Sequence, residues 1–235
     1  MSIITMKNLE KEYNTNGIVV RAVRGVDLSI ERGEFSAIAG PSGSGKTTLL
    51  NIMGGLDRPT RGAVKVADND LSTMTAKELS DMRLRRIGFI FQAYNLIPVL
   101  SAIENVEYVL LLQGVDREER ARRCREILAE VGLESEMNRL PRELSGGQQQ
   151  RVAVARAIVS EPDIVLADEP TANLDQQTGA NLLDLMKELN SKKKITFLFS
   201  THDGMVMERA ERLIYLTDGN IRSDKKKGRA RRARR

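Results

Sequence analysis

A glycine-rich octamer constrains this chain more than any other feature, and it reads Gly40-Pro41-Ser42-Gly43-Ser44-Gly45-Lys46-Thr47. It satisfies the pattern G-x-x-x-x-G-K-[ST], in which glycines leave backbone N–H groups free to surround phosphate oxygens. Residues 34–39 before it predict a buried strand, and residues 46–54 predict the helix that follows. This order is the context that a phosphate loop requires. We expect Lys46 to neutralise the β and γ phosphates of a bound nucleotide and Thr47 to ligate magnesium.

A second glycine-rich turn occurs later in the chain, at Leu144-Ser145-Gly146-Gly147-Gln148. It precedes a helical segment, residues 149–160, whose positive end and free N–H groups suit a phosphate. Alone, this turn is an ordinary helix start. Together with the phosphate loop, it predicts an ATP site divided between two copies of the chain.

Two acids follow an apolar run, Ile164-Val165-Leu166-Ala167, and are therefore expected at the carboxyl end of a buried strand. Asp168 is predicted to hold the magnesium shell. Glu169 is the candidate general base that orients or deprotonates the water attacking the γ phosphate. The alternative, two solvated acids at a strand end, loses weight because the phosphate loop is present.

Two further polar residues have candidate roles. His202 is the sole histidine and follows the apolar segment 195–200, which places it at a strand end where a donor meets the γ phosphate. The alternative is a structural histidine. Gln92 follows Phe89-Ile90-Phe91 and precedes a helical block, so its amide can reach water or a metal shell. Tyr13, predicted on a loop, either stacks on adenine or anchors that loop by packing.

The remaining pattern predicts an α/β chain. Strands that alternate with helices indicate a parallel sheet covered on both faces, and the β-rich opening indicates a small antiparallel layer. The expected strands are residues 3–9, 18–23, 26–30, 34–39, 63–66, 163–167 and 195–200, with an amphipathic helix at 177–189. Helical periodicity between residues 93 and 159, with Ile127, Leu128 and Val131 on one face, predicts an inserted lobe.

Composition places the chain among cytoplasmic proteins. It has 235 residues, 41% of them hydrophobic, which is ample for a core, and it contains no apolar run long enough to span a bilayer. The opening residues lack the layout of a secretory signal. Cys124 is the only cysteine, so no intramolecular disulfide forms, and we interpret it as an incidental thiol.

The net charge of +5 comes from one end of the chain, because Lys225–Arg235 holds eight basic residues and no acid. The rest is mildly acidic. This segment lacks the apolar residues to fold alone, and a solvated tail is the simplest interpretation. The alternatives are attraction to anionic lipid headgroups and, less favoured, binding to nucleic acid or ribosomes.

Taken together, residues 2–222 resemble the ATPase subunits of ABC transporters. Residues 144–148 match the family signature, Gln92 its Q-loop, Ala172-Asn173-Leu174-Asp175 its D-loop, His202 its switch histidine and Tyr13 its adenine-stacking aromatic. The resemblance implies a P-loop NTPase (RecA-like) core of residues 1–92 and 160–222 and a helical signature subdomain of residues 93–159. Residues 223–235 would form a basic tail.

The resemblance also implies the mechanism and the partners. Two copies would bind head to tail around two MgATP, each nucleotide held by the phosphate loop and Thr48 of one copy and by Ser145–Gln148 and Asp175 of the other. Hydrolysis at Glu169 would reopen this dimer and drive transmembrane permease subunits, so the chain would lie at the inner face of the cell membrane. Segments around Gln92 and Asp168 look like the lipoprotein-releasing and macrolide-exporter branch, whose permeases have few membrane helices and a large external domain.

Two other functions are compatible with parts of the pattern. A soluble ATP-gated clamp on ribosomes or nucleic acid would share the phosphate loop and the signature, and the basic tail favours it. Such proteins usually carry two ATPase domains or a long coiled coil, which 235 residues do not accommodate. A small-molecule kinase would use the phosphate loop but leaves residues 144–148 unexplained.

Overall fold

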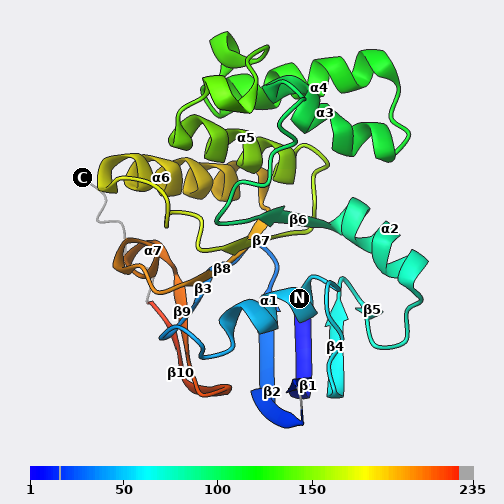
Figure 1. Cartoon of the computed structure of the whole chain (residues 1–235), viewed down its shortest axis with the longest axis vertical. Coiled ribbons are helices and arrows are strands. Elements are labelled where there is room, and N and C mark those ends of the chain that lie inside the picture. Colours follow the sequence, from blue (N-terminus) through cyan, green and yellow to red (C-terminus); the bar gives the residue numbers. More distant parts are fainter. Residues whose placement is uncertain (16, 228–235) are drawn as a thin grey trace.

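Two β-sheets and a helical lobe make up the chain in the computed structural model, which describes residues 1–15 and 17–227 (Figure 1). One sheet has the strand order β2-β1-β4-β5 and the other the order β10-β9-β3-β8-β7-β6. The strands are β1 (Ser2–Thr15), β2 (Ile18–Glu31), β3 (Phe35–Ala39), β4 (Arg61–Val66), β5 (Asn69–Asp70), β6 (Ile87–Ile90), β7 (Ile164–Asp168), β8 (Thr196–Thr201), β9 (Arg212–Thr217) and β10 (Asn220–Lys226). The helices are α1 (Lys46–Met53), α2 (Ala76–Arg86), α3 (Ala102–Leu112), α4 (Arg117–Glu130), α5 (Gly146–Ile158), α6 (Gln176–Lys193) and α7 (Gly204–Arg209), with short 3-10 turns at Glu134–Glu136 and Pro141–Glu143.

The larger sheet is the parallel core that the sequence predicts. Strands β6, β7, β8, β3 and β9 pair in parallel, and β10 joins antiparallel at one edge. Every residue of β3 and β8 is buried, because helices or the second sheet cover both faces. The carboxyl ends of parallel strands share one edge, so the loops after β3, β7 and β8 meet there. The prediction of an α/β fold with an antiparallel layer is confirmed.

Helix α1 is packed between the two sheets. Its apolar side chains Leu49, Ile52 and Met53 are fully buried in a cluster that takes residues from both sheets, among them Met6 and Leu198. Full burial of such a side chain contributes about 1.5–3 kcal/mol. This packing fixes the direction of the helix that follows the phosphate loop.

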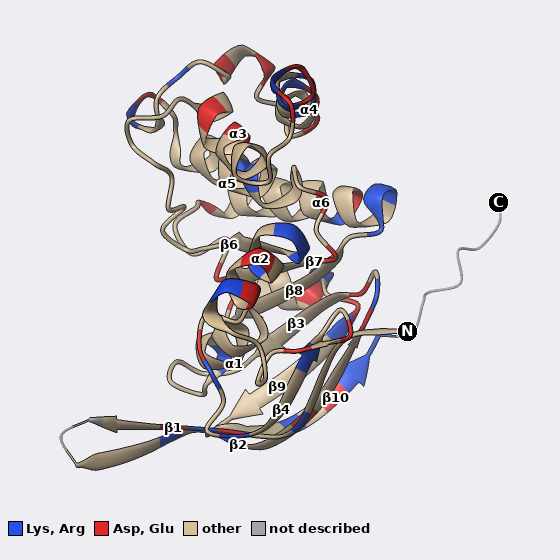
Figure 2. Cartoon of the chain, turned by 90° about the vertical axis from the view of Figure 1, so that its right-hand side faces the viewer, with Lys and Arg blue, Asp and Glu red and all other residues tan. Residues whose placement is uncertain are grey.

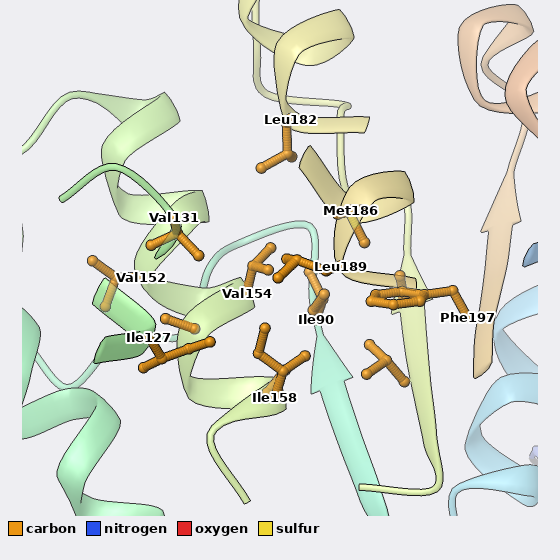
Figure 3. Close-up of a cluster of buried hydrophobic side chains, with 14 of the residues drawn as sticks. Ile90, Ile127, Val131, Val152, Val154, Ile158, Leu182, Met186, Leu189 and Phe197 are labelled. Carbon is orange, nitrogen blue, oxygen red and sulfur yellow. The ribbon is translucent and has the colours of Figure 1, made fainter. Parts of the chain in front are cut away.

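A second apolar cluster joins the helical lobe to the opposite face of the parallel sheet (Figure 3). Ile127 and Val131, predicted on one helical face, lie in this cluster beside Val154 and Ile158 of α5 and Met186 of α6. Helices α3, α4 and α5 form the lobe at the top of Figure 1. The amphipathic pattern of this block therefore marks its buried face correctly, whereas the domain boundaries at residues 92 and 160 stay a prediction.

The interpretation of residues 223–235 as a tail is wrong at its start. Residues 223–226 belong to β10, where Asp224 pairs with Ile214 in the antiparallel register. The strand is held by charge: Arg212 donates to both Asp224 oxygens at 2.7 and 2.6 Å, and Lys226 lies 2.8 Å from Glu34. A pattern that counts apolar residues cannot detect such a strand. Residues 228–235 lie outside the described residues.

The opening strands also differ from expectation. Residues 18–31 form one strand rather than two, because the Arg24-Gly25 position is a bulge within the pair and not a turn. Gly25 has φ +67°, and a Cβ there would lie 3.1 Å from Asn8 Oδ1. The separate strands expected at residues 18–23 and 26–30 would need a turn here, whereas the positive φ of Gly25 forms a bulge inside a sheet. Tyr13 lies in β1 opposite Val20, not on a loop.

The sequence pattern did not indicate the strongly charged α2 or the short elements β5, β6 and α7, and it also missed β9. Figure 2 shows the resulting mixture of charges, with Lys and Arg on the edge strand β10 and both signs along α4. Among residues 1–15 and 17–227, no helix combines the length and the apolar character that crossing a membrane needs.

Candidate nucleotide-binding site

A cavity of about 690 Å³ opens at the carboxyl edge of the parallel sheet. The loop after β3 contributes the phosphate loop, the end of β7 contributes Asp168 with Glu169 next to it, and the loop after β8 contributes His202. Its lining residues are Val20, Arg21, Ala22, Arg24, Pro41, Ser42, Gly43, Gly45, Lys46, Thr47, Thr48, Gln92, Asp168, Glu169, His202, Asp218 and Gly219. The fold therefore brings most of the predicted site residues into one space.

Two glycines of the phosphate loop are required by close backbone approach. A Cβ on Gly40 would lie 2.1 Å from Leu216 O, and one on Gly45 would lie 2.4 Å from Ala22 O. Gly45 also has φ +101° and is the N-cap of α1. Of the α-helices in the described part of the chain, α1 alone starts without a side-chain cap, so its first-turn N–H groups are open to an anion.

Lys46 is the cation of the phosphate loop, and its buried side chain contacts the backbone of the same loop. Lys46 is 7% exposed, and its Nζ donates to Gly40 O at 2.8 Å and to Pro41 O at 2.9 Å. An ammonium held over a ring of backbone donors suits a polyphosphate. Ser44 Oγ is buried without a hydrogen-bond partner among the described residues, and it would lie 2.9 Å from a Cβ on Gly40.

Hard oxygen ligands lie together beside the loop. Thr47 Oγ1 donates to Asp168, with its oxygens at 3.2 and 3.1 Å. A hydroxyl and a single carboxylate, completed by substrate phosphates, are the donor set that Mg²⁺ accepts. Gln92 lines the same cavity and is exposed. These three side chains fit a magnesium ion that arrives with a triphosphate.

Glu169 and His202 form the second group in the cavity. His202 Nδ1 lies 2.7 Å from Glu169 Oε1, while Thr201 Oγ1 donates to Glu169 Oε2 at 3.1 Å. The Glu169 side chain is 15% exposed and that of His202 is 69% exposed. Glu169 has φ +46°, a left-handed conformation that costs a non-glycine residue about 1–3 kcal/mol. Its N–H donates to Ser200 O at 2.9 Å, so β8 holds the strained carboxylate in place.

The second glycine-rich turn lies away from this cavity. None of Ser145, Gly146, Gly147 and Gln148 is among the lining residues, because the turn begins α5 on the helical lobe. Ser145 Oγ accepts from Gln148 N at 3.3 Å, so this N–H is already used within the turn. A Cβ on Gly147 would lie 2.5 Å from Thr178 Cγ2. If this turn binds nucleotide, it must be the nucleotide of another copy.

The geometry does not test the nucleotide contacts predicted for Asp175 and Tyr13. Asp175 is the N-cap of α6 and accepts from Thr178 N at 3.0 Å, and hydrogen bonds from Thr178 lower its carboxyl pKa. Tyr13 donates to Asp57 at 2.7 Å, and the Lys11 ammonium lies 4.7 Å from the ring centroid. Burial first, then the bond to Asp57, raises the Tyr13 pKa. Neither residue lines the cavity, and stacking on adenine stays a prediction.

The sequence pattern missed six lining residues, namely Val20, Arg21, Ala22, Arg24, Asp218 and Gly219. They come from β2 and from the β9–β10 turn. Gly219 N donates to Ser44 O at 3.0 Å, and Arg24 N donates to Gly219 O at 2.9 Å. The Asp218-Gly219 dipeptide is a turn signal, but only the pairing of β9 and β10 with the sheet brings it to the phosphate loop.

Comparisons with known proteins agree with this geometry. Residues 23–172 match the family model described as ABC transporter. The chain is 46% identical over 93% of its length to the lipoprotein-releasing system ATP-binding protein LolD of Syntrophus aciditrophicus, covering 98% of that protein. It is also 46% identical over 95% of its length to the macrolide export ATP-binding/permease protein MacB of Rhodopseudomonas palustris, but spans only 34% of it.

A solved structure agrees over the whole fold. The ATP-binding cassette MJ0796 of Methanocaldococcus jannaschii, described as a dimeric post-hydrolysis state bound to ADP and Pi, matches with a TM-score of 0.88. The sequences are 44% identical, and the match covers 95% of this chain and 98% of that one.

Proposed function

This chain belongs to the ABC transporter family, and we propose that it is an ATP-binding, ATP-hydrolysing subunit that powers membrane subunits. The observation that carries the proposal is the single cavity holding the phosphate loop, Asp168, Glu169 and His202. A phosphate-binding loop alone would suit many enzymes. A carboxylate held by strand β8 and paired with a histidine beside that loop suits hydrolysis of the terminal phosphate.

Binding of MgATP follows from the loop geometry. The uncapped start of α1 and the buried Lys46 ammonium receive the phosphate oxygens, and Lys46 exchanges its bonds to Gly40 O and Pro41 O for them. Thr47 and Asp168 supply oxygen ligands to the metal, with Gln92 reaching it from the loop after β6. The metal, when bound, neutralises charge that develops on the phosphates.

Hydrolysis is assigned to Glu169. Its carboxylate accepts a proton from, or orients, the water that attacks the γ phosphate. Thr201 and His202 hold the carboxylate, and His202 also lines the cavity that would receive the γ phosphate. Because Glu169 is largely buried, its position is set before the nucleotide arrives, which lowers the reorganisation needed for reaction.

Two copies of the chain form the complete site in this proposal. The turn Ser145–Gln148 is remote from the cavity of its own chain, and Gly146 and Gly147 stand in the first turn of α5, where backbone N–H groups have no carbonyl of a preceding turn to bond. A head-to-tail dimer would place this turn on the triphosphate of the partner. Asp175, at the start of α6, would approach the same interface, and Tyr13 and Thr48 would flank the base and phosphates.

The membrane partner is a permease that docks on the apolar groove between α2, β6, α3 and the last turn of α5. This groove has a volume of about 340 Å³ and is lined by Leu56, Leu84, Phe89, Phe91 and Val109 among others. Leu56 is 49% exposed, and Leu111 and Leu112 on α3 are 50% and 55% exposed. Exposed apolar side chains around a groove are typical of a protein interface. The chain would then lie at the inner face of the cell membrane.

The finer assignment follows the named relatives. From the lipoprotein-releasing and macrolide-export relatives we propose that the permease has few membrane helices and a large external domain. We propose export or lipoprotein extraction as the transport step. The basic residues 225–235 add attraction to anionic headgroups. A pull-down from native membranes tests these points, since recovery of ribosomal proteins alone would favour a soluble clamp instead.

The decisive experiment uses Glu169→Gln, which keeps the shape of the side chain and removes its basicity. We expect hydrolysis to fall by about 10²–10⁴ while ATP is retained. Size-exclusion chromatography with saturating MgATP should then show a dimer. The control is Glu188→Gln on the exposed face of α6, which should hydrolyse ATP like the parent. A Glu169→Gln chain that stays monomeric at saturating ATP contradicts the two-copy site.

A further inference from the structure

A largely enclosed arginine, Arg156, binds the backbone of the segment that carries Gln92. It lies in the last turn of α5, and its guanidinium donates to Asn95 O at 2.5 Å and to Tyr94 O at 2.8 Å. No described acid acts on its pKa, which burial alone lowers below the usual value. A guanidinium removed from water without a carboxylate needs such hydrogen bonds to offset its desolvation.

The two accepting carbonyls belong to strained residues. Tyr94 and Asn95 have φ +59° and +51°, so two consecutive non-glycine residues adopt the left-handed conformation. Such a conformation is unfavourable for a non-glycine residue and persists only where the surroundings hold it. The planar fork of an arginine, unlike the ammonium of a lysine, places two N–H groups on both carbonyls at once. Arg156 thus holds a backbone shape that this segment would not keep alone.

The same segment contacts two other parts of the candidate site. Asn173, in the turn before α6, donates through Nδ2 to Gln92 O at 2.8 Å. The Tyr94 hydroxyl lies 3.5 Å from Asn173 O, and a Cβ on Gly146 would lie 2.9 Å from that hydroxyl. The Tyr94 side chain therefore lies against Gly146, the first residue of α5. The carbonyls of Tyr94 and Asn95 accept from Arg156, in the last turn of the same helix. Movement of α5 relative to the cavity must displace Gln92.

We propose that Arg156 is a positioning residue for ATP hydrolysis: by holding the carbonyls of Tyr94 and Asn95, it sets the position at which Gln92 enters the cavity. Arg156 and Asn95 also line the apolar groove. A segment bound in that groove would touch the same two residues, so its binding would shift the position of Gln92 through this contact. The inference rests on the proposed ATPase activity and concerns a residue that touches neither nucleotide nor metal.

The test replaces Arg156 by Met, which keeps the aliphatic stem and removes both donors. We expect kcat for ATP hydrolysis by the full chain to fall about ten- to hundredfold, because displacing a catalytic group by about 1 Å has effects of that size. KM for MgATP should change less than about twofold, since Lys46 and the start of α1 are not altered. Arg156→Lys, which donates to one carbonyl at a time, should recover part of the loss.

The matched control is Arg151→Met. Arg151 lies on the same helix and also donates to a backbone carbonyl, Val131 O at 2.7 Å, but that carbonyl belongs to the helical lobe. Its loss should leave kcat within about twofold at equal folded fraction. Hydrogen exchange distinguishes the two variants. Arg156→Met should speed exchange in a peptide covering residues 92–97 and not in one covering α5, whereas Arg151→Met should do neither.

A double-mutant cycle with Gln92→Ala decides whether Arg156 acts through Gln92. If it does, Arg156→Met lowers kcat less than about twofold in the Gln92→Ala background, because the position of an absent amide no longer matters. If the fold-losses in kcat of Arg156→Met and Gln92→Ala multiply in the double variant, the proposal is overturned. An unchanged kcat in Arg156→Met alone would overturn it as well. Absence of ATP hydrolysis by the parent chain would instead contradict the proposed function.

Discussion

Replacing Arg212 by Met tests the argument that charge holds the last strand on the sheet. Arg212 is 9% exposed and donates to Ser29 O at 2.7 Å, to Glu34 Oε2 at 3.0 Å and to both oxygens of Asp224. The variant keeps an apolar stem but leaves Asp224 without its main partner and Glu34 without one of its three hydrogen-bond donors. This network adds to the backbone pairing of β10 with β9 and to the packing of Ile221 against the core.

The expected loss is about 3 kcal/mol of unfolding free energy. Removing one partner of a buried ion pair costs about 3–5 kcal/mol, because the remaining charge stays buried and unpaired. The lower end applies here since the Asp224 side chain is 36% exposed and Glu34 keeps contacts to Lys226 and Ser36. Urea unfolding followed by circular dichroism measures this loss, with an unchanged m-value if both states keep their compactness.

The pH dependence provides a second readout with a defined sign. Burial raises the pKa of Glu34, but hydrogen bonds from Lys226, Ser36 and Arg212 outweigh it and hold the pKa below its ordinary value. The bond from Arg212 likewise lowers the pKa of Asp224. A carboxyl with a lowered folded-state pKa stabilises the fold above its unfolded pKa, near pH 4, and loses that contribution as the pH falls. The difference between parent and variant should therefore shrink below about pH 4.

Arg209→Met is the matched control, because Arg209 pairs with Asp184 at 2.8 Å on the surface, where the Asp184 side chain is 66% exposed. Exposed pairs contribute about 0–1 kcal/mol. A loss below about 1 kcal/mol for Arg212→Met would refute the reasoning, since the network would then behave like this surface pair. Arg212→Met should also raise KM for ATP, because the β9–β10 turn that Arg212 helps to hold donates from Gly219 N to Ser44 O of the phosphate loop.

Three further outcomes are expected. Gly45→Ala should abolish nucleotide binding in a fluorescent-analogue titration, because the new Cβ would lie 2.4 Å from Ala22 O in a residue with φ +101°; binding within about twofold of the parent would contradict the loop geometry. His202→Ala removes the contact 2.7 Å from Glu169 and should lower kcat about 10–10³-fold in steady-state assays with little change in melting temperature. Cys124 is buried and its pKa is raised to about 12, so iodoacetamide should label it at pH 8 only after urea is added, as mass spectrometry can verify.

Much of the candidate site was readable from local patterns. The phosphate loop, the acids after an apolar run and the histidine after another are each defined by contiguous residues, and the fold places all three in one cavity. Their convergence could be predicted because parallel strands end at a common edge. The amphipathic pattern around Ile127 and Val131 likewise identified a face that is buried.

The failures share one cause, which is that the information lies in long-range contacts. Lys226 belongs to a strand because Arg212 of β9 lies opposite it and Glu34, far away in the sequence, pairs with its ammonium. Gly25 forms a bulge instead of a turn because β1 continues alongside. Tyr13 is a strand residue held by Asp57, which no window around position 13 contains.

The sequence by itself determined the candidate chemistry of this protein: the phosphate loop, the two acids predicted to hold a metal and to act as general base, and the second glycine-rich turn are local motifs with their own physical requirements. Only the tertiary structure decided their distribution, with Glu169 held by β8 inside the cavity and Ser145–Gln148 kept away from it on the lobe. The physical reason is that backbone conformation and residue chemistry act over a few neighbours, whereas the position of a motif depends on how sheets and helices bury their apolar faces together. The contact between Arg156 and the Gln92 segment, sixty-one and sixty-two residues apart in sequence, exists only at that level.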